Sequence, residues 1–246
     1  MPESAKPNDS SKPFASDRPR SYTPRSAGVG LRPTTKVKRM PFMEHWDNGQ
    51  GYNLDLTELG QAIRATDAVL AMAKSRGSHV RVLCTTMTNA VRDDLWYSAA
   101  GITYGDRLEQ VANAGGRVQI IVAADYAEEK QSFSPSVLNA IGKFGAGPGG
   151  PVQIVYDGEA DFFSTFPHFT ITNKGGGQWF SAVEWKSTDH DFRGMVLDDS
   201  FQATAYGCTA EADEVGNELS GPFDRVFHKL THQRSCVGFS GTALKE

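Results

Sequence analysis

A repeated order of helix, glycine and buried strand constrains the fold of this chain more than any other feature. Apolar residues recur at three- and four-residue steps from Leu56 toward Arg76, a spacing that predicts an amphipathic helix. Gly77 is placed to end that helix. The apolar run that begins at Val80, VRVLCTT, is typical of a buried strand.

The same order occurs twice more along the chain. A helical pattern at residues 108–112 is stopped by Gly115 and followed by the strand VQIIVA, residues 118–123. A third helix opens at Ser134 as its N-cap and precedes the strand VQIVY, residues 152–156. Three helix–strand units in series predict an α/β fold with a mixed, mostly parallel sheet covered by helices on both faces.

After these units the pattern changes to strands joined by turns. Residues 168–173, 178–186 and 192–197 form three such segments, which predict an antiparallel edge on the sheet. The final fifty residues carry apolar side chains at helical spacing, including Phe201 and Ala205, and they predict helices with a break at Gly221–Pro222.

His168 begins the segment HFTITNK, and the element order around it resembles a single repeat of the phospholipase D superfamily. The resemblance covers residues 50–230 and includes the strand RVQII and the later segments MVLDDS and FDRVF. The signature of that superfamily is His-x-Lys-x-x-x-x-Asp. Here Thr170 stands at the lysine position and Gly175 at the aspartate position, so the repeat is divergent and its motif is degenerate.

The resemblance implies a phosphodiesterase or phosphoryl-group transferase that uses His168 as a nucleophile, without a metal or cofactor. Strand alternation places Thr170 on the same face as His168, so its hydroxyl could donate a hydrogen bond to phosphate. A single repeat supplies half of a site, so the resemblance also implies a homodimer acting on a phosphodiester of lipid or nucleic acid. The alternative is a catalytically inactive binding or scaffold module of the same fold.

A second chemistry is available to the strand that follows. Glu184 and Lys186 form a Glu-x-Lys triplet with Trp185 between them, and Asp161 lies upstream. In metal-dependent nucleases, carboxylates in such a pattern hold Mg²⁺ while the lysine polarises the attacking water. The triplet is short, and cross-strand charge pairs produce it by chance.

Two other groups of residues have a structural and a functional interpretation. His228, His232 and Cys236 fall at i, i+4 and i+8, which fits a zinc site less well than one face of a helix. Arg92 lies near Trp96 and Tyr104, where aromatic rings could stack on bases, although a place in the core is favoured.

Charge separates the chain into two parts. Residues 1–40 contain nine basic and three acidic residues and are rich in proline and serine, which predicts a disordered basic arm followed by one domain at 41–246. The arm is interpreted as a solubilising tail or an electrostatic tether. No apolar run is long enough to span a bilayer and the N-terminus has no signal-peptide core, so we expect a soluble, cytoplasmic protein.

Overall fold

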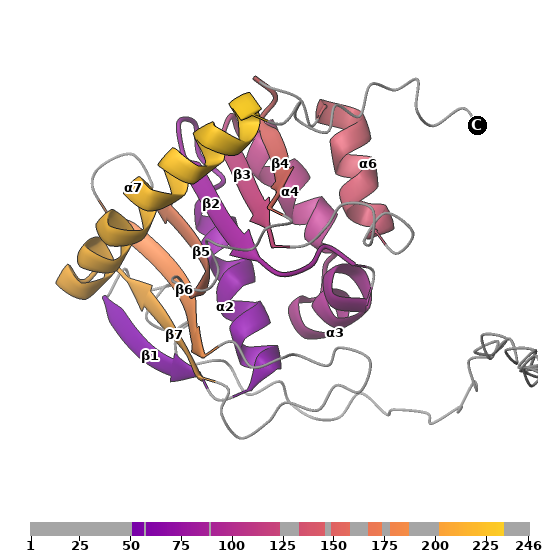
Figure 1. Ribbon diagram of the computed structural model, residues 1–246. Coiled ribbons are helices and arrows are strands. Elements are labelled where there is room, and N and C mark those ends of the chain that lie inside the picture. Colours follow the sequence, from indigo (N-terminus) through magenta and orange to yellow (C-terminus); the bar gives the residue numbers. More distant parts are fainter. Residues whose placement is uncertain are drawn as a thin grey trace, which may run out of the picture. The chain divides into compact units, whose positions relative to one another are not determined.

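The computed structural model describes eight stretches of the chain, which form a sheet with helices on both faces (Figure 1). They are residues 51–56, 58–88, 90–123, 133–145, 149–157, 167–173, 178–186 and 202–233. The predicted α/β class with a mixed, doubly covered sheet is confirmed. Several predicted features lie outside these stretches, namely the basic arm at 1–40, Asp161, Gly175, the strand at 192–197 and Cys236.

The sheet contains seven strands in the order β1-β7-β6-β5-β2-β3-β4. They are β1 (Tyr52–Leu56), β2 (His79–Cys84), β3 (Arg117–Val122), β4 (Val152–Tyr156), β5 (His168–Asn173), β6 (Trp179–Lys186) and β7 (Gln202–Gly207). Within this described sheet β2, β3 and β4 pair in parallel, while the other four pairings are antiparallel. The sheet is therefore less parallel than predicted, because β1 and β7, which the sequence pattern does not predict as strands, add antiparallel pairings.

Three helices precede the parallel strands in the predicted order. They are α2 (Leu59–Met72), α4 (Tyr104–Asn113) and α6 (Pro135–Phe144). Gly77 and Gly115 follow the first two with φ angles of 80° and 81°, a left-handed conformation that costs glycine little. A π-helical turn (Ala90–Leu95) and α3 (Trp96–Ala100) connect β2 to α4, and α7 (Ala210–Gln233) is the last described element.

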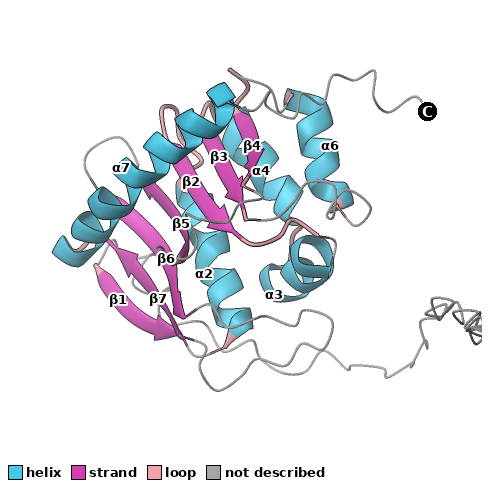
Figure 2. Ribbon diagram, in the orientation of Figure 1, coloured by secondary structure: helices cyan, strands magenta, loops and turns pink. Residues whose placement is uncertain are grey.

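The helices divide between the two faces of the sheet (Figure 2). Helix α7 crosses one face, where Phe223 and Phe227 pack against residues such as Phe169 and Ile171. Helix α2 covers the other face beside β5, β6 and β7. Because successive strand residues point to opposite faces, His168 and Thr170 share a face as predicted, and it is the face that α2 covers.

Local pattern was misleading at both ends of the described domain. Leu56 ends strand β1 and the first helix begins only at Leu59, whereas Ala205 lies within strand β7 rather than in a helix. The Gly221–Pro222 pair does not break the last helix, which continues through Pro222. A proline inside a helix costs about 3 kcal/mol, and burial of large side chains on both sides of it, Leu219 and Phe223 among them, is of comparable size.

No helix in the described stretches combines the length and the apolar character needed to cross a membrane.

Candidate active site

Sheet topology brings His168 to the end of the sheet at which the parallel strands have their carboxyl ends. Strand β5 runs antiparallel to β2 and pairs Phe169 with Leu83, so the first residue of β5 lies beside the last residues of β2. In α/β sheets ligands bind outside the carboxyl ends of the parallel strands. His168 thus lies at the edge where ligand sites of such sheets occur.

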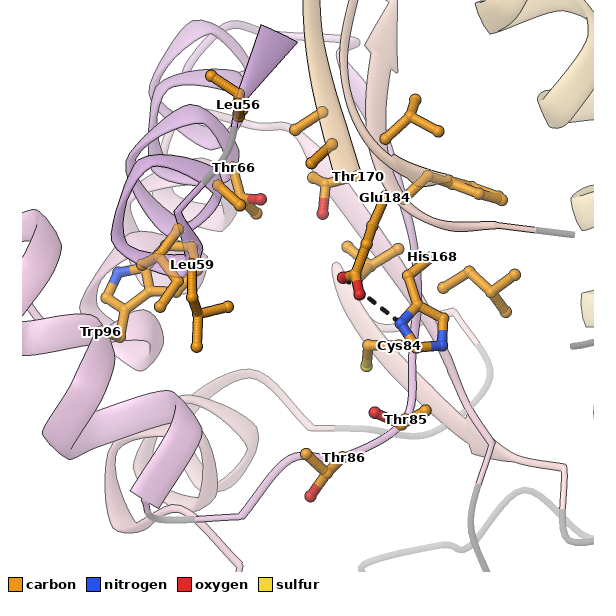
Figure 3. Close-up of a pocket in the computed structure, with 18 of the residues that line it drawn as sticks. Leu56, Leu59, Thr66, Cys84, Thr85, Thr86, Trp96, His168, Thr170 and Glu184 are labelled. Carbon is orange, nitrogen blue, oxygen red and sulfur yellow. Dashed lines mark ion pairs between the residues drawn. The ribbon is translucent and has the colours of Figure 1, made fainter. Parts of the chain in front are cut away.

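The hairpin of β5 and β6 places a carboxylate opposite the histidine. Glu184 is the cross-strand partner of His168, and His168 Nδ1 lies 3.7 Å from Glu184 Oε2 (Figure 3). The side chains are only 11% and 16% exposed. This distance between the two atoms is within ion-pair range and longer than a hydrogen bond.

A pocket of about 100 Å³ opens beside this pair. In Figure 3 the side chains of α2 and Trp96 face those of His168, Thr170 and Glu184, with Thr85 and Thr86 at the end of β2. Much of the lining is apolar, contributed by Leu56, Leu59, Ala62, Ile63, Val82, Trp96, Ala182 and Ala203. Charges interact more strongly in such surroundings than in water.

Polar groups are distributed among these apolar walls. Thr170 is 4% exposed and lines the pocket together with Thr66, Thr85 and Thr86. Arg92, 8% exposed, also lines the pocket. Hydroxyl groups and a guanidinium are donors for the oxygens of an anionic ligand, and a histidine beside a carboxylate is a candidate nucleophile or base.

The structure therefore brings the two predicted site residues, His168 and Thr170, to one pocket and places Glu184 beside His168. Of Lys186 only the backbone is described, where its pairing with Gln202 follows an irregularity in the ladder. Among the described residues no group of three or more histidine, cysteine, aspartate or glutamate side chains could hold a metal ion. The Glu-x-Lys nuclease remains a prediction.

The contact between His168 and Glu184 follows from the register of the hairpin, in which Asn173 pairs with Trp179 and His168 with Glu184. The sequence of the two strands does not fix that register, because it does not show which residues pair. No signal in the sequence marked Arg92 either, whose position depends on the tertiary contacts of the π-helical turn.

The other candidate groups have a structural explanation. Trp96 and Tyr104 are fully buried and meet edge to face at 4.6 Å between ring centroids, as the core interpretation predicted. His228 and His232 are exposed on α7 with ring centroids 3.9 Å apart. Their exposure is greater than the predicted half-buried helix face, and Cys236 lies outside the described residues.

Comparison with known proteins gives likeness only to solved structures. No protein-family model and no curated protein sequence matches the chain. NucT from Helicobacter pylori is 14% identical, with a TM-score of 0.42 over 77% of this chain and 99% of NucT. TrmBL2 is an archaeal chromatin protein whose structure shows a novel mode of DNA binding, and it is 10% identical to this chain. The match has a TM-score of 0.39 and covers 72% of this chain and 52% of the TrmBL2 chain.

A third solved structure is larger than the region it shares. Polyphosphate kinase from Porphyromonas gingivalis is 11% identical, with a TM-score of 0.46 over 80% of this chain, which spans 28% of the kinase. All three TM-scores lie below 0.5, so the proposals below rest on the residues of this chain.

Proposed function

We propose that the protein is a metal-independent phosphodiesterase or phosphoryl-group transferase with His168 as its nucleophile. The pairing of His168 Nδ1 with Glu184 Oε2 across the β5–β6 ladder, at 3.7 Å, is the observation that carries this proposal. A carboxylate beside one ring nitrogen favours a proton there, which leaves the lone pair of Nε2 for attack. Both side chains lie at the edge where ligands bind in sheets of this type.

The reaction has two steps that balance without a redox partner. Nε2 of His168 attacks phosphorus, the bond from phosphorus to the leaving oxygen breaks, and that oxygen takes up a proton. Water or another acceptor hydroxyl then attacks the same phosphorus, loses its proton, and the phosphorus–nitrogen bond breaks to restore the imidazole. While phosphorylated, the ring is positively charged and carries its proton on Nδ1, and Glu184 stabilises that cation.

The proton for the leaving oxygen is assigned to a second His168. The resemblance implies a pair of histidines, and one copy of the chain supplies one histidine at this position. We therefore propose that the active species is a homodimer in which two His168 residues face each other across a two-fold axis. Sedimentation of an active enzyme as a monomer at micromolar concentration would exclude that arrangement.

Hydrolysis of bis-p-nitrophenyl phosphate tests the proposal. We expect slow turnover that persists in EDTA and is abolished in His168→Ala, with a phosphorylated enzyme that is stable in alkali and labile in acid. His228→Ala is the matched control, because His228 is exposed on α7, and it should retain full activity. Both variants should unfold at the temperature of the wild type within a few degrees.

Two outcomes would overturn the proposal. Activity lost to EDTA and to Glu184→Ala, but retained in His168→Ala, would point to the Glu-x-Lys nuclease. No turnover of diester or monoester substrates by the folded wild type would leave a binding module built on the same fold.

A further inference from the structure

A buried arginine lines the same pocket as His168. Arg92 is 8% exposed and is the one arginine or lysine among the described residues that line this pocket. The lysine of the His-x-Lys signature is absent, and Thr170 at its position can donate a hydrogen bond but cannot neutralise charge. We infer that Arg92 binds the phosphate group of the substrate, an inference that rests on the proposed function.

Hydrogen bonds fix the Arg92 guanidinium near the carboxyl end of β2. Its Nε and Nη2 donate to the backbone oxygen of Thr86 at 3.1 and 2.9 Å. Thr86 follows β2 by two residues, and β2 is the neighbour of β5, which begins at His168. The charge is thus held at the edge of the sheet that carries the nucleophile.

The π-helical turn that contains Arg92 is tied to the rest of the domain from its other side. The Asp93 carboxylate accepts hydrogen bonds from Ser134 Oγ at 2.7 Å and from the Ser136 backbone N–H at 3.1 Å, at the start of α6. The Arg92 N–H donates to the Thr88 backbone oxygen at 2.9 Å. Turns of this kind occur often at functional sites, and one anchored at several points holds a binding group in a fixed position.

The environment of the guanidinium preserves its charge. Its Cζ atom lies 4.7 Å from the centroid of the Tyr104 ring, a stacking contact that does not remove charge. Burial raises the pKa of the Tyr104 phenol, so no phenolate forms to neutralise Arg92. Glu184 brings a negative charge to the same pocket, and an anion would therefore bind at the end formed by Arg92 and Thr86.

Arg64 is a control for the possibility that the role of Arg92 is purely structural. Arg64 on α2 also donates from Nε to a backbone oxygen, that of Ala99, at 2.8 Å. Arg64 is partly buried and is not among the residues that line the pocket. Replacement of Arg64 reports on the loss of a guanidinium anchor without the loss of a pocket charge.

Binding of inorganic phosphate, measured by calorimetry on the full chain, tests the inference. We expect Arg92→Met to weaken phosphate binding at least tenfold, Arg92→Lys to weaken it less, and Arg64→Met to leave it unchanged. Saturable binding that is equal in wild type and Arg92→Met, or no saturable binding by wild type, would overturn the inference.

Hydrogen exchange covers the case in which Arg92 variants do not fold. In the wild type, phosphate should slow amide exchange in a peptide that spans residues 85–95 and leave a peptide from α7 unchanged. Equal exchange with and without phosphate would count against the inference.

The inference and the proposed function can fail separately. Phosphate binding that depends on Arg92 in a protein without turnover would refute the function and keep the subsite. Turnover that depends on His168, with phosphate binding unchanged in Arg92→Met, would support the proposed function and refute the Arg92 subsite. If both hold, kcat/KM of Arg92→Met should fall roughly a hundredfold, the usual consequence of removing one donor to a developing anion.

Discussion

The two ends of the β2–β5 pair each hold a histidine, and their polar partners differ. At the amino end of β2, His79 Nε2 lies 2.6 Å from Gln119 Oε1. Gln119 Nε2 in turn donates to Gln153 Oε1 at 2.8 Å, so Gln119 Oε1 acts as an acceptor and His79 as a donor. At the other end, His168 faces the carboxylate of Glu184 instead of an amide.

The partners give the two histidines different capacities. Burial, followed by the nearby charge of Arg81, lowers the pKa of His79 from 6.5 to about 4. His79 is thus a neutral hydrogen-bond donor in a chain of side chains, His79, Gln119 and Gln153, that crosses β2, β3 and β4. A carboxylate can stabilise an imidazolium during a reaction, whereas an amide in a fixed network cannot. The comparison teaches that a position at the head of a strand leaves the chemistry of a histidine open, and that the charge of the side chain beside its ring distinguishes the two positions.

The largest expected effect concerns His79 and the dependence of stability on pH. Its folded-state pKa is lower than its unfolded value, so the neutral form stabilises the fold fully above about pH 6.5. That contribution is lost as pH falls from 6.5 toward 4, and a shift of this size corresponds to about 3 kcal/mol. Urea unfolding of His79→Gln should show a loss of stability between these pH values that is smaller by about this amount.

His228→Gln provides the matched control for that experiment. His228 is exposed on α7, so its replacement should leave the pH dependence of the unfolding free energy as in the wild type. Carboxyl groups titrate in the same pH range in every variant, and the difference between variants isolates His79. Identical pH profiles for His79→Gln and wild type would contradict the claim that the fold holds His79 in its neutral form.

Periodic and capping signals predicted the parts of the fold that depend on local sequence. The three helix–strand units were predicted because an apolar face, a Ser134 cap and glycines such as Gly77 each act within a few residues. Strand β7 could not be predicted in this way. Ala203 and Ala205 are buried between β1 and β6, and small residues favour a strand only where neighbouring strands surround them.

In the candidate site, too, only the features that depend on local sequence could be predicted. His168 and Thr170 could be placed on one face because strand alternation is a local property. Arg92 could not be assigned to the pocket, because its position depends on Thr86 and on the contact of Asp93 with α6, which no spacing in the sequence reports. The sequence offers Glu184 either as a ligand in a Glu-x-Lys nuclease or as part of a cross-strand charge pair. Its contact with His168 depends on the register of the hairpin, which local spacing does not fix.

The smaller expected effect concerns Glu184 and sharpens the other side of the comparison. Glu184→Gln preserves shape and removes the charge beside His168 Nδ1. At about 4 Å a pair of unit charges interacts by about 1 kcal/mol in water and about 4 kcal/mol near a protein surface. A side chain that is 16% exposed lies between these limits, so we expect a loss of about 2 kcal/mol, or roughly thirtyfold in kcat.

Steady-state kinetics on bis-p-nitrophenyl phosphate measure this loss, and Glu218→Gln is the control because Glu218 is exposed on α7. In the proposed mechanism a positive charge develops on the imidazole as phosphorus is attacked, so the loss should fall on kcat and leave KM nearly unchanged. In Glu184→Gln the side chain beside His168 is a neutral amide, as Gln119 is beside His79. Wild-type kcat in Glu184→Gln would therefore mean that the partner's charge does not distinguish the two histidines, and that His168 draws any reactivity from elsewhere in the pocket.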